Sequence, residues 1–501
     1  MQELDVLIIG AGLSGVGAAW HLAERCPQKR FLLLEGREAI GGTWDLFRYP
    51  GIRSDSDMYT LGYHFRPWRG KQAIADGTSI REYIKDTARE AGIVDRIRFQ
   101  RRVVRADWRS AEARWVVTAE TPSGQEQYAA RFLYACTGYY NYESGYTPDF
   151  PGVENFRGDF IHPQHWPEDL DTSGKRVVVI GSGATAITLV PVLAERARQV
   201  TMLQRSPTYV LSLPDDDVLA QLLQRALPEQ LAYSITRAKN VALGSLFYQF
   251  AQRYPKLTRR LLRRAAIHQL GDTEVVDTHF NPRYDPWDER LCVAPNGDIF
   301  RALREGRAQV VTDTIEAFTE DGLRLGSGEH LEADVVVSAT GLRAELLSGL
   351  ALELEGEPVE MAERTAYRGV MFSDLPNFAV AVGYTNASWT LKCDLSAEHV
   401  CRLLNHMDER GYAQVTPRVR DVSMPRLPLL NLQSGYVKRA SAGMPKQGAW
   451  GPWRLHQSYL SDLWSLRYGR LVTPELEFAR EPRAARVQGS ATSSVALAAA
   501  G

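Results

Sequence analysis

Cysteine is scarce in this chain of 501 residues, and its few cysteines form neither a redox pair nor a metal-binding pattern. Five of them stand far apart, without any Cys-x-x-Cys spacing: Cys26, Cys136, Cys292, Cys393 and Cys401. Disulfide scaffolds use even sets of cysteines, and cysteine-based zinc sites use pairs at short spacings such as Cys-x-x-Cys. The sequence therefore argues against a disulfide framework and a dithiol redox centre, predicts no metal site, and favours a reducing, cytoplasmic setting.

The chain also lacks an excess of one charge and a long apolar run. It has 59 basic and 60 acidic residues, a formal net charge of -1, so no overall field would attract nucleic acid. No apolar run reaches the ~20 residues of a transmembrane helix. The first strand begins near Leu4, so no export leader is expected.

The length is too great for a single core, so two or three domains are expected. Two glycine-rich segments each follow a buried apolar strand and open a helical pattern. In the first, residues 4–9 lead into Gly10, Gly12 and Gly15. The first glycine permits a tight turn, the second lets the backbone approach a pyrophosphate, and the third lets helix and strand pack closely. Ser14 adds a hydroxyl at the helix start. These features predict a dinucleotide site.

The acid that follows this site indicates which dinucleotide it binds. A second strand, residues 31–34, ends in Glu35, twenty residues beyond Gly15. A carboxylate there accepts hydrogen bonds from ribose hydroxyls and would repel a 2'-phosphate. The first site is therefore predicted to bind FAD.

The second segment has the opposite charge at the equivalent position. A strand at 176–180 precedes the fingerprint residues Gly181, Ser182, Gly183, Ala184, Thr185 and Ala186. The next strand, 200–203, is followed by Arg205 and Ser206. Arginine pairs with a 2'-phosphate, so this site is predicted to bind NADPH. The fold class predicted from both segments is α/β, with two Rossmann-like domains.

Residues 211–280 break the alternation of strands and helices and predict a helical insertion. Within it, residues 256–264 carry basic pairs four residues apart, which share one helix face. A solvated face is one interpretation of this pattern. Contact with a membrane surface is the other.

The stretch FRGDFIHPQHWP, residues 156–167, joins the two nucleotide segments. Its pattern consists of Phe156, Gly158, His162, Trp166 and Pro167. One interpretation is a buried aromatic linker in which His162 caps a turn. The other is a hinge between two cofactor sites, because the pattern resembles the fingerprint of the Baeyer-Villiger monooxygenases, flavoproteins that insert one oxygen atom beside a carbonyl.

The resemblance extends over roughly residues 4–480 and is closest to the EthA-type, prodrug-activating branch of that family. It rests on SDSDMYTLG at 54–62, HPQHWPEDLD at 162–171, the proline-rich loop at 281–292 and GYTNASWTLK at 383–392. The resemblance implies further FAD contacts at Gly42, Thr43, Trp44, Arg53, Asp55 and Val103. It also implies that the loop through Trp389 lies against the flavin ring.

The resemblance further implies two catalytic residues, Arg290 and Asp55. An arginine is always charged and rich in donors, so Arg290 would stabilise negative oxygen, with Asp55 holding it in place. Glu289 departs from the lysine common in the family at that position, which affects the expected contacts with NADP. The alternatives are a surface ion pair between Arg290 and Asp288 or Asp285, and a turn-capping role for Asp55.

The domain boundaries follow from these segments. The expected division is 1–150 and 336–482 for the FAD-binding domain, 151–335 for the NADP-binding domain, and 483–501 for a disordered tail. A strand at 333–339 is expected to return the chain to the first domain.

The function implied is FAD- and NADPH-dependent oxygenation of ketones to esters by O2, with oxidation of sulfide or thioamide sulfur as a further activity. An N- or S-oxygenating flavin-containing monooxygenase, which transfers electrophilic oxygen, is an alternative. A redox-sensing flavoprotein without turnover is the non-enzyme alternative. Contact with a membrane remains a minor possibility, and the sequence does not predict an oligomeric state.

Overall fold

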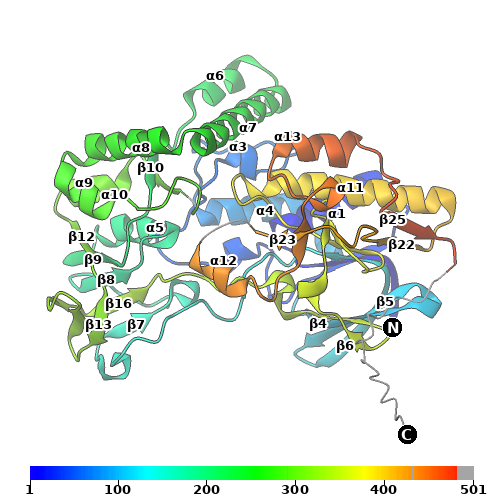
Figure 1. The fold of residues 1–501 in the computed structure, drawn as a ribbon, viewed down its shortest axis with the longest axis horizontal. Coiled ribbons are helices and arrows are strands. Elements are labelled where there is room, and N and C mark those ends of the chain that lie inside the picture. Colours follow the sequence, from blue (N-terminus) through cyan, green and yellow to red (C-terminus); the bar gives the residue numbers. More distant parts are fainter. Residues whose placement is uncertain (290, 431–433, 482–501) are drawn as a thin grey trace, which may run out of the picture.

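The computed structural model describes residues 1–289, 291–430 and 434–481. Two sheets lie side by side, and a row of helices runs along one edge of both, at the top of Figure 1. The larger sheet has nine strands and the smaller has five. The predicted α/β class with two Rossmann-like units and a helical insertion is confirmed.

The nine-stranded sheet is built around β1 (Gln2–Ile9), which is parallel to β2 (Phe31–Leu34) and β6 (Gly124–Ala135). All four residues of β2 are buried, as expected for a strand covered on both faces. Its other members are β3 (Ile97–Arg98), β4 (Arg102–Arg109), β5 (Arg114–Thr121), β17 (Ala351–Leu354), β18 (Glu357–Pro358) and β21 (Phe378–Val380).

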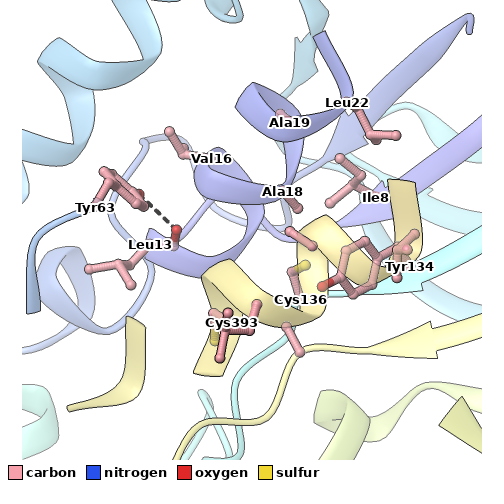
Figure 2. Packing of buried hydrophobic residues seen from close by; sticks show 14 of the residues in the cluster. Ile8, Leu13, Val16, Ala18, Ala19, Leu22, Tyr63, Tyr134, Cys136 and Cys393 are labelled. Carbon is pink, nitrogen blue, oxygen red and sulfur yellow. Dashed lines mark hydrogen bonds between the residues drawn. The ribbon is translucent and has the colours of Figure 1, made fainter. Parts of the chain in front are cut away.

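One face of this sheet is covered by α1 (Leu13–Arg25) and α11 (Trp389–Arg410), which pack against each other. Figure 2 shows side chains of both helices meeting Tyr134 of β6. The Tyr63 hydroxyl donates to the Leu13 carbonyl over 2.7 Å, the dashed line in that view. Three more helices complete this unit: α2 (Thr43–Leu46), α3 (Met58–Leu61) and α4 (Gly77–Glu90).

The five-stranded sheet is entirely parallel, in the order β12-β9-β8-β16-β7. Its strands are β7 (Asp159–Ile161), β8 (Arg176–Ile180), β9 (Gln199–Gln204), β12 (Ala308–Thr312) and β16 (Val335–Ser338). The expectation that the 333–339 strand returns the chain to the first unit was wrong, because β16 pairs with β8 and β7 here. Parallel strands buried on both faces have the same composition in either sheet.

Helices and a small two-stranded sheet cover this second unit. They are α5 (Ala184–Leu193), α9 (Thr273–His279), α10 (Asp298–Arg304), β10 (Val210–Leu213) and β11 (Cys292–Pro295). A three-stranded antiparallel sheet extends from the unit: β13 (Ile315–Phe318), β14 (Gly322–Leu325) and β15 (His330–Glu332).

The predicted insertion forms the left and central helices at the top of Figure 1 and contacts both units. Its helices before α9 are α6 (Val218–Ala226), α7 (Glu229–Arg253) and α8 (Pro255–Leu270). On α7, the buried Arg237 guanidinium donates to the carbonyls of Tyr59 and Gly62, each over 2.7 Å, at the end of α3. In contrast, α8 packs on α10 and β10 of the second unit.

The C-terminal part of the described chain packs on the nine-stranded unit. Its elements are β19 (Ala366–Tyr367), β20 (Met371–Phe372), β22 (Gln414–Pro417), β23 (Arg426–Pro428), α12 (Gly435–Ala440), β24 (Lys446–Gly448), α13 (Tyr459–Asp462) and β25 (Leu476–Ala479). The expected tail at 483–501 lies outside the described residues. Among the helices that are described, none is both long and apolar enough to cross a membrane.

Candidate active site

The turn between β1 and α1 is tight because its glycines have no side chains. Backbone segments approach one another there more closely than any other residue would allow. Gly10 has a φ of +102°, and a Cβ there would lie 2.6 Å from the Cys136 carbonyl oxygen. A Cβ on Gly15 would lie 1.9 Å from the Gly10 carbonyl oxygen. No side chain caps the N-terminus of α1 at Gly12. The first N–H groups of the helix therefore remain available for a phosphate.

Next to this turn is a cavity of about 280 Å³, here called the Glu35 cavity. Five predicted FAD contacts line it: Gly10, Gly12, Glu35, Gly42 and Val103. Glu35 accepts hydrogen bonds from the backbone N–H of Ala11, at 2.7 Å, and of Arg37, at 2.9 Å. Burial raises the pKa of the Glu35 carboxyl, although these two bonds act in the opposite direction.

A second cavity, of about 260 Å³, lies on the other side of Gly12 and is called the Asp55 cavity. Seven predicted FAD contacts line it: Gly12, Ser14, Gly42, Thr43, Trp44, Arg53 and Asp55. The cavities share Gly12 and Gly42, and a Cβ on Gly42 would lie 2.9 Å from the Gly12 Cα. Cys136 and Tyr142 also line both cavities, so the two spaces adjoin and together suit an elongated ligand.

Aromatic side chains form much of the wall of the Asp55 cavity. Tyr139, Tyr140, Tyr142, Tyr384 and Trp389 all line it. The rings of Tyr139 and Trp389 stack with centroids 4.8 Å apart, and the Trp389 indole donates to the Ser14 hydroxyl over 2.8 Å. The three tyrosines at 139–142 were not predicted from the sequence, although they follow β6 after only three residues.

Arg53 presents a polar group to the Asp55 cavity and also joins the two units. Its Nη1 pairs with Asp298 Oδ2 on α10 over 2.5 Å. Its Nη2 is buried and has no hydrogen-bond partner among the described residues. A buried donor of this kind costs free energy unless a ligand satisfies it. Asp298 was not anticipated from the sequence.

The N-terminus of α5 reaches the Asp55 cavity from the second unit. Ala184 and Thr185 line the cavity, and a Cβ on Gly181 would lie 2.3 Å from the Ala339 carbonyl oxygen. Ala186 is fully buried and serves the packing of α5. The second site thus opens toward the first.

The other residues predicted to contact NADP lie at the rim of this second site. Gly183 and Arg205 are exposed, and the Ser182 hydroxyl donates to the Ser206 carbonyl over 3.0 Å. The arrangement leaves an open surface between α5 and the end of β9.

The 156–167 segment contributes β7 (Asp159–Ile161), an edge strand of the five-stranded sheet, followed by a short 3-10 helix at Pro163–His165. Phe156 packs edge-on against Phe318, and a Cβ on Gly158 would lie 2.4 Å from the Asp334 carbonyl oxygen. His162 Nε2 lies 3.1 Å from the Gly341 carbonyl oxygen, and its Nδ1 accepts from the Gln164 N–H at 3.1 Å.

This segment therefore has the features of the linker interpretation, in which Phe156 packs against other aromatic side chains and His162 caps a turn. Trp166 is half-buried and packs against the second unit, just before Pro167. Burial lowers the pKa of His162, so the ring favours the neutral form. The hinge interpretation stays a prediction.

Arg290, the predicted catalytic arginine, lies outside the described residues. Of its neighbours in the sequence, Arg283 is exposed and Glu289 is half-buried. Burial raises the pKa of the Glu289 carboxyl. The catalytic role of Asp55 also stays a prediction, although Asp55 lines the cavity.

A buried polar cluster connects α1, α7 and α11 near these cavities. Ligand atoms of His21, His64 and Asp394 lie within 4.8 Å of one another, so the group could hold a metal by distance alone. Arg237 also reaches Asp394, at 3.5 Å. Although burial raises it, the pKa of Asp394 is held below its usual value by hydrogen bonds from both histidines. These contacts already neutralise the carboxylate.

Two family models match the chain. A NAD(P)-binding Rossmann-like domain matches residues 8–68, and a flavin-binding monooxygenase-like model matches residues 73–239. The first match begins at the end of β1 and includes the glycine turn, α1 and Glu35, which lie at the Glu35 cavity.

The chain is also similar to curated proteins over nearly its whole length. It is 52% identical to the FAD-containing monooxygenase EthA of Mycobacterium tuberculosis over 96% of this chain and 99% of the relative. It is 49% identical to the probable FAD-binding monooxygenase AlmA of an Acinetobacter species, over 95% of this chain and 96% of the relative.

Among solved structures, the fold is similar to an oxidized steroid monooxygenase bound to NADP. The TM-score is 0.76 at 22% identity, covering 96% of this chain and 100% of the other. An open crystal structure of cyclohexanone monooxygenase gives a TM-score of 0.71 at 18% identity, again covering 96% and 100% of the two chains. At these identities the likeness concerns the fold alone.

Proposed function

Since the chain belongs to the family of EthA-type FAD-containing monooxygenases, we propose that it uses FAD, NADPH and O2 to convert ketones to esters. Oxidation of sulfide or thioamide sulfur is a further proposed activity. The observation that carries the proposal is the continuity of the Glu35 and Asp55 cavities past the N-terminus of α1, with α5 of the second unit opening into the same space.

The residues present fit FAD. The Glu35 cavity supplies a carboxylate for ribose hydroxyls, and the shared glycines leave room for a pyrophosphate. The Asp55 cavity offers a flat aromatic wall and the buried Nη2 donor of Arg53. Gly15 serves the close packing that holds this site open.

The residues of the second unit fit NADPH. Arg205 is exposed at the end of β9. Burial raises the pKa of Glu289, and the positive charge of Arg205 acts in the opposite direction. Arg205 would pair with the 2'-phosphate, while the N–H groups at the start of α5 and the Ser182 hydroxyl would meet the pyrophosphate. Bound NADPH would supply the hydride, and bound FAD the two-electron chemistry that activates O2.

Arg290 and Asp55 are the proposed catalytic residues. The guanidinium of Arg290 is always charged and presents several donors. It would stabilise the negative charge that develops on the carbonyl oxygen of the ketone. Asp55 would orient Arg290 and moderate its charge. The aromatic wall would exclude water from the reacting atoms, which strengthens both effects.

Tyr384 is proposed to determine which substrates fit. It lines the Asp55 cavity and two small apolar cavities beside it, of about 30 and 20 Å³. Its hydroxyl donates to Asp462 over 2.7 Å, and Asp462 pairs with the buried Lys392 over 2.8 Å. Because this ionic network fixes the ring between apolar spaces, the best substrates should be small molecules with apolar groups beside the carbonyl or sulfur. The proposed location is the cytoplasm.

The test is NADPH consumption by the purified protein with a panel of ketones, sulfides and amines, with the products analysed by mass spectrometry. Ester formation supports the proposal. Products from the amine and sulfide alone would favour the N- or S-oxygenating alternative. If the protein binds FAD but no substrate increases its oxygen uptake, the redox-sensing alternative is favoured.

A further inference from the structure

The helical insertion carries a concentration of positive charge that the rest of the chain does not share. Between Glu229 and Asp272 there is no acidic residue, but there are eight basic ones: Arg237, Lys239, Arg253, Lys256, Arg259, Arg260, Arg263 and Arg264. The whole chain has a net charge of only -1. This stretch forms α7 and α8.

Half of these cations form ion pairs or hydrogen bonds with side chains of the protein itself. Arg237, Lys239 and Arg263 pair with the carboxylates of Asp394, Asp217 and Asp277, and Arg259 donates to Asn281. In the described chain, no ion pair includes the other four: Arg253, Lys256, Arg260 and Arg264. Three of those four lie on α8.

On α8 these cations alternate with exposed leucines. Lys256, Arg260 and Arg264 are four residues apart, and Leu257 and Leu261 lie one position after the first two. All five are exposed, with 44% of Leu257 and 47% of Leu261 accessible to solvent. The opposite side of the helix is buried through Thr258, Leu262, Ala266 and Leu270. We call the five exposed residues the α8 face.

The neighbouring helices also carry exposed apolar side chains. Eleven of the nineteen large hydrophobic side chains exposed among the described residues fall between positions 213 and 261. On α6 these include Leu219 and Leu222, and on α7 they include Leu243 and Leu246. Figure 1 shows α6, α7 and α8 along one edge of the molecule.

We infer that the α8 face and its neighbours dock the protein on the surface of an anionic lipid bilayer. Leucines interleaved with cations suit this partner, because the apolar groups enter the headgroup boundary while the cations meet lipid phosphates. The stems of lysine and arginine also bury along the apolar surface. The helix would lie on the membrane and not cross it.

Charge and composition disfavour other occupants. A second copy of this surface would bring the cations of Arg253, Lys256, Arg260 and Arg264 against the same four, with repulsion at close range. A nucleic acid would leave the exposed leucines against phosphates and ribose, where they gain little. An anionic bilayer satisfies both kinds of side chain.

The test measures binding of the full-length holoenzyme to vesicles of phosphatidylcholine, with and without phosphatidylglycerol. The first variant removes the cations (Lys256→Gln, Arg260→Gln, Arg264→Gln), and the second removes the leucines (Leu257→Gln, Leu261→Gln). Exposed residues on other elements give the matched controls: Lys71→Gln, Arg198→Gln, Arg410→Gln for charge, and Val422→Gln, Leu427→Gln for apolar surface. Two measurements show that each variant is folded: the amount of FAD that it binds, and its rate of NADPH oxidation.

The protein should bind vesicles that contain phosphatidylglycerol much more tightly than phosphatidylcholine alone. Each interfacial cation contributes about fivefold to binding, so the variant that lacks three of them should bind roughly a hundredfold more weakly. The leucine variant should also bind more weakly, and both controls should bind as the unchanged protein does. High salt should weaken binding of the unchanged protein.

Three results would overturn the inference. The first is no binding of the unchanged protein to the anionic vesicles. The second is an equal loss of binding in the cation variant and its control. The third is a change of oligomeric state in the leucine variant with vesicle binding intact, which would make the face an interface between copies. A preference for RNA over anionic vesicles would likewise identify a different partner.

Discussion

Arg53 and Asp298 form an ion pair, 2.5 Å between Nη1 and Oδ2, that connects the Asp55 cavity to α10 of the second unit. Both side chains are largely buried, with 12% and 14% of their side-chain surface exposed. The pair therefore links a proposed cofactor contact to the relative placement of the two units.

Removing one partner of this pair should destabilise the protein. Asp298→Ala would leave the Arg53 charge buried without its carboxylate, which typically costs about 3 to 5 kcal/mol. Thermal unfolding followed by flavin fluorescence measures the effect. Glu316→Ala is the control, because the Arg324–Glu316 pair is half exposed on both sides and should be worth at most about 1 kcal/mol. If Asp298→Ala and Glu316→Ala lower the free energy of unfolding equally, the buried Arg53–Asp298 pair contributes no more than an exposed pair.

Arg205 should select between the two nicotinamide cofactors. Arg205→Ala should raise the KM for NADPH much more than the KM for NADH, because only NADPH carries a 2'-phosphate. Arg198→Ala, an exposed arginine at the other end of the same strand, is the control. If both KM values rise equally, Arg205 does not bind the 2'-phosphate.

Acid should weaken the fold through His399, which is buried in α11. Burial, aided by the positive charges of Arg368, Arg402 and Lys392, lowers the pKa of His399 to about 3. The unfolded chain then takes up a proton near pH 6.5 that the folded chain does not. Stability should fall as the pH drops from about 6.5 toward 3, by about 1.4 kcal/mol per pH unit from this group.

Urea unfolding between pH 7 and pH 5 measures that slope. The slope should be smaller in His399→Gln than in the unchanged protein, and unaltered in His268→Gln on the exposed side of α8. A slope that His399→Gln leaves unchanged would mean that another group causes the acid sensitivity.

Local sequence patterns predicted those parts of the fold that depend only on residues close together in the sequence. The strand, glycine turn and helix at residues 2–25 form as expected because apolar runs and obligatory glycines act locally. The strand at 335–338 was assigned to the wrong unit because its valines would suit either parallel sheet.

The candidate site was only partly predictable for a related reason. Contacts such as Arg53 with Asp298 join residues 245 positions apart, and nothing in either local sequence specifies the other. The aromatic wall could have been anticipated in part, since Tyr139 and Tyr140 follow the end of a strand that leads into the site. Loops at the carboxyl ends of such strands commonly carry the ligand contacts.

The proposed role of Arg290 predicts a selective loss of oxygenation. Arg290→Ala should keep its FAD and still bind NADPH, because both fingerprints lie elsewhere in the sequence. Loss of a preorganised donor to developing negative oxygen typically costs about 3 to 4 kcal/mol, so ester formation should fall roughly a hundred- to a thousand-fold. Arg290→Lys should recover little, since a point charge does not replace the planar array of donors.

The comparison is ester formed against NADPH consumed. NADPH consumption with release of peroxide should persist in Arg290→Ala, while Arg283→Ala in the same loop serves as the control. Near-normal ester formation in Arg290→Ala would transfer the role to another cation, with Arg283 the first to examine.

The proposed reaction inserts one atom of O2 beside a carbonyl at the expense of NADPH. The most direct measurement is turnover of an aliphatic ketone under ¹⁸O2, with mass spectrometry of the product and parallel measurement of NADPH consumed. The expected product is an ester that contains one ¹⁸O atom, formed in proportion to the NADPH consumed. NADPH oxidation that yields only peroxide with every ketone tested, or a product without the label, would contradict it.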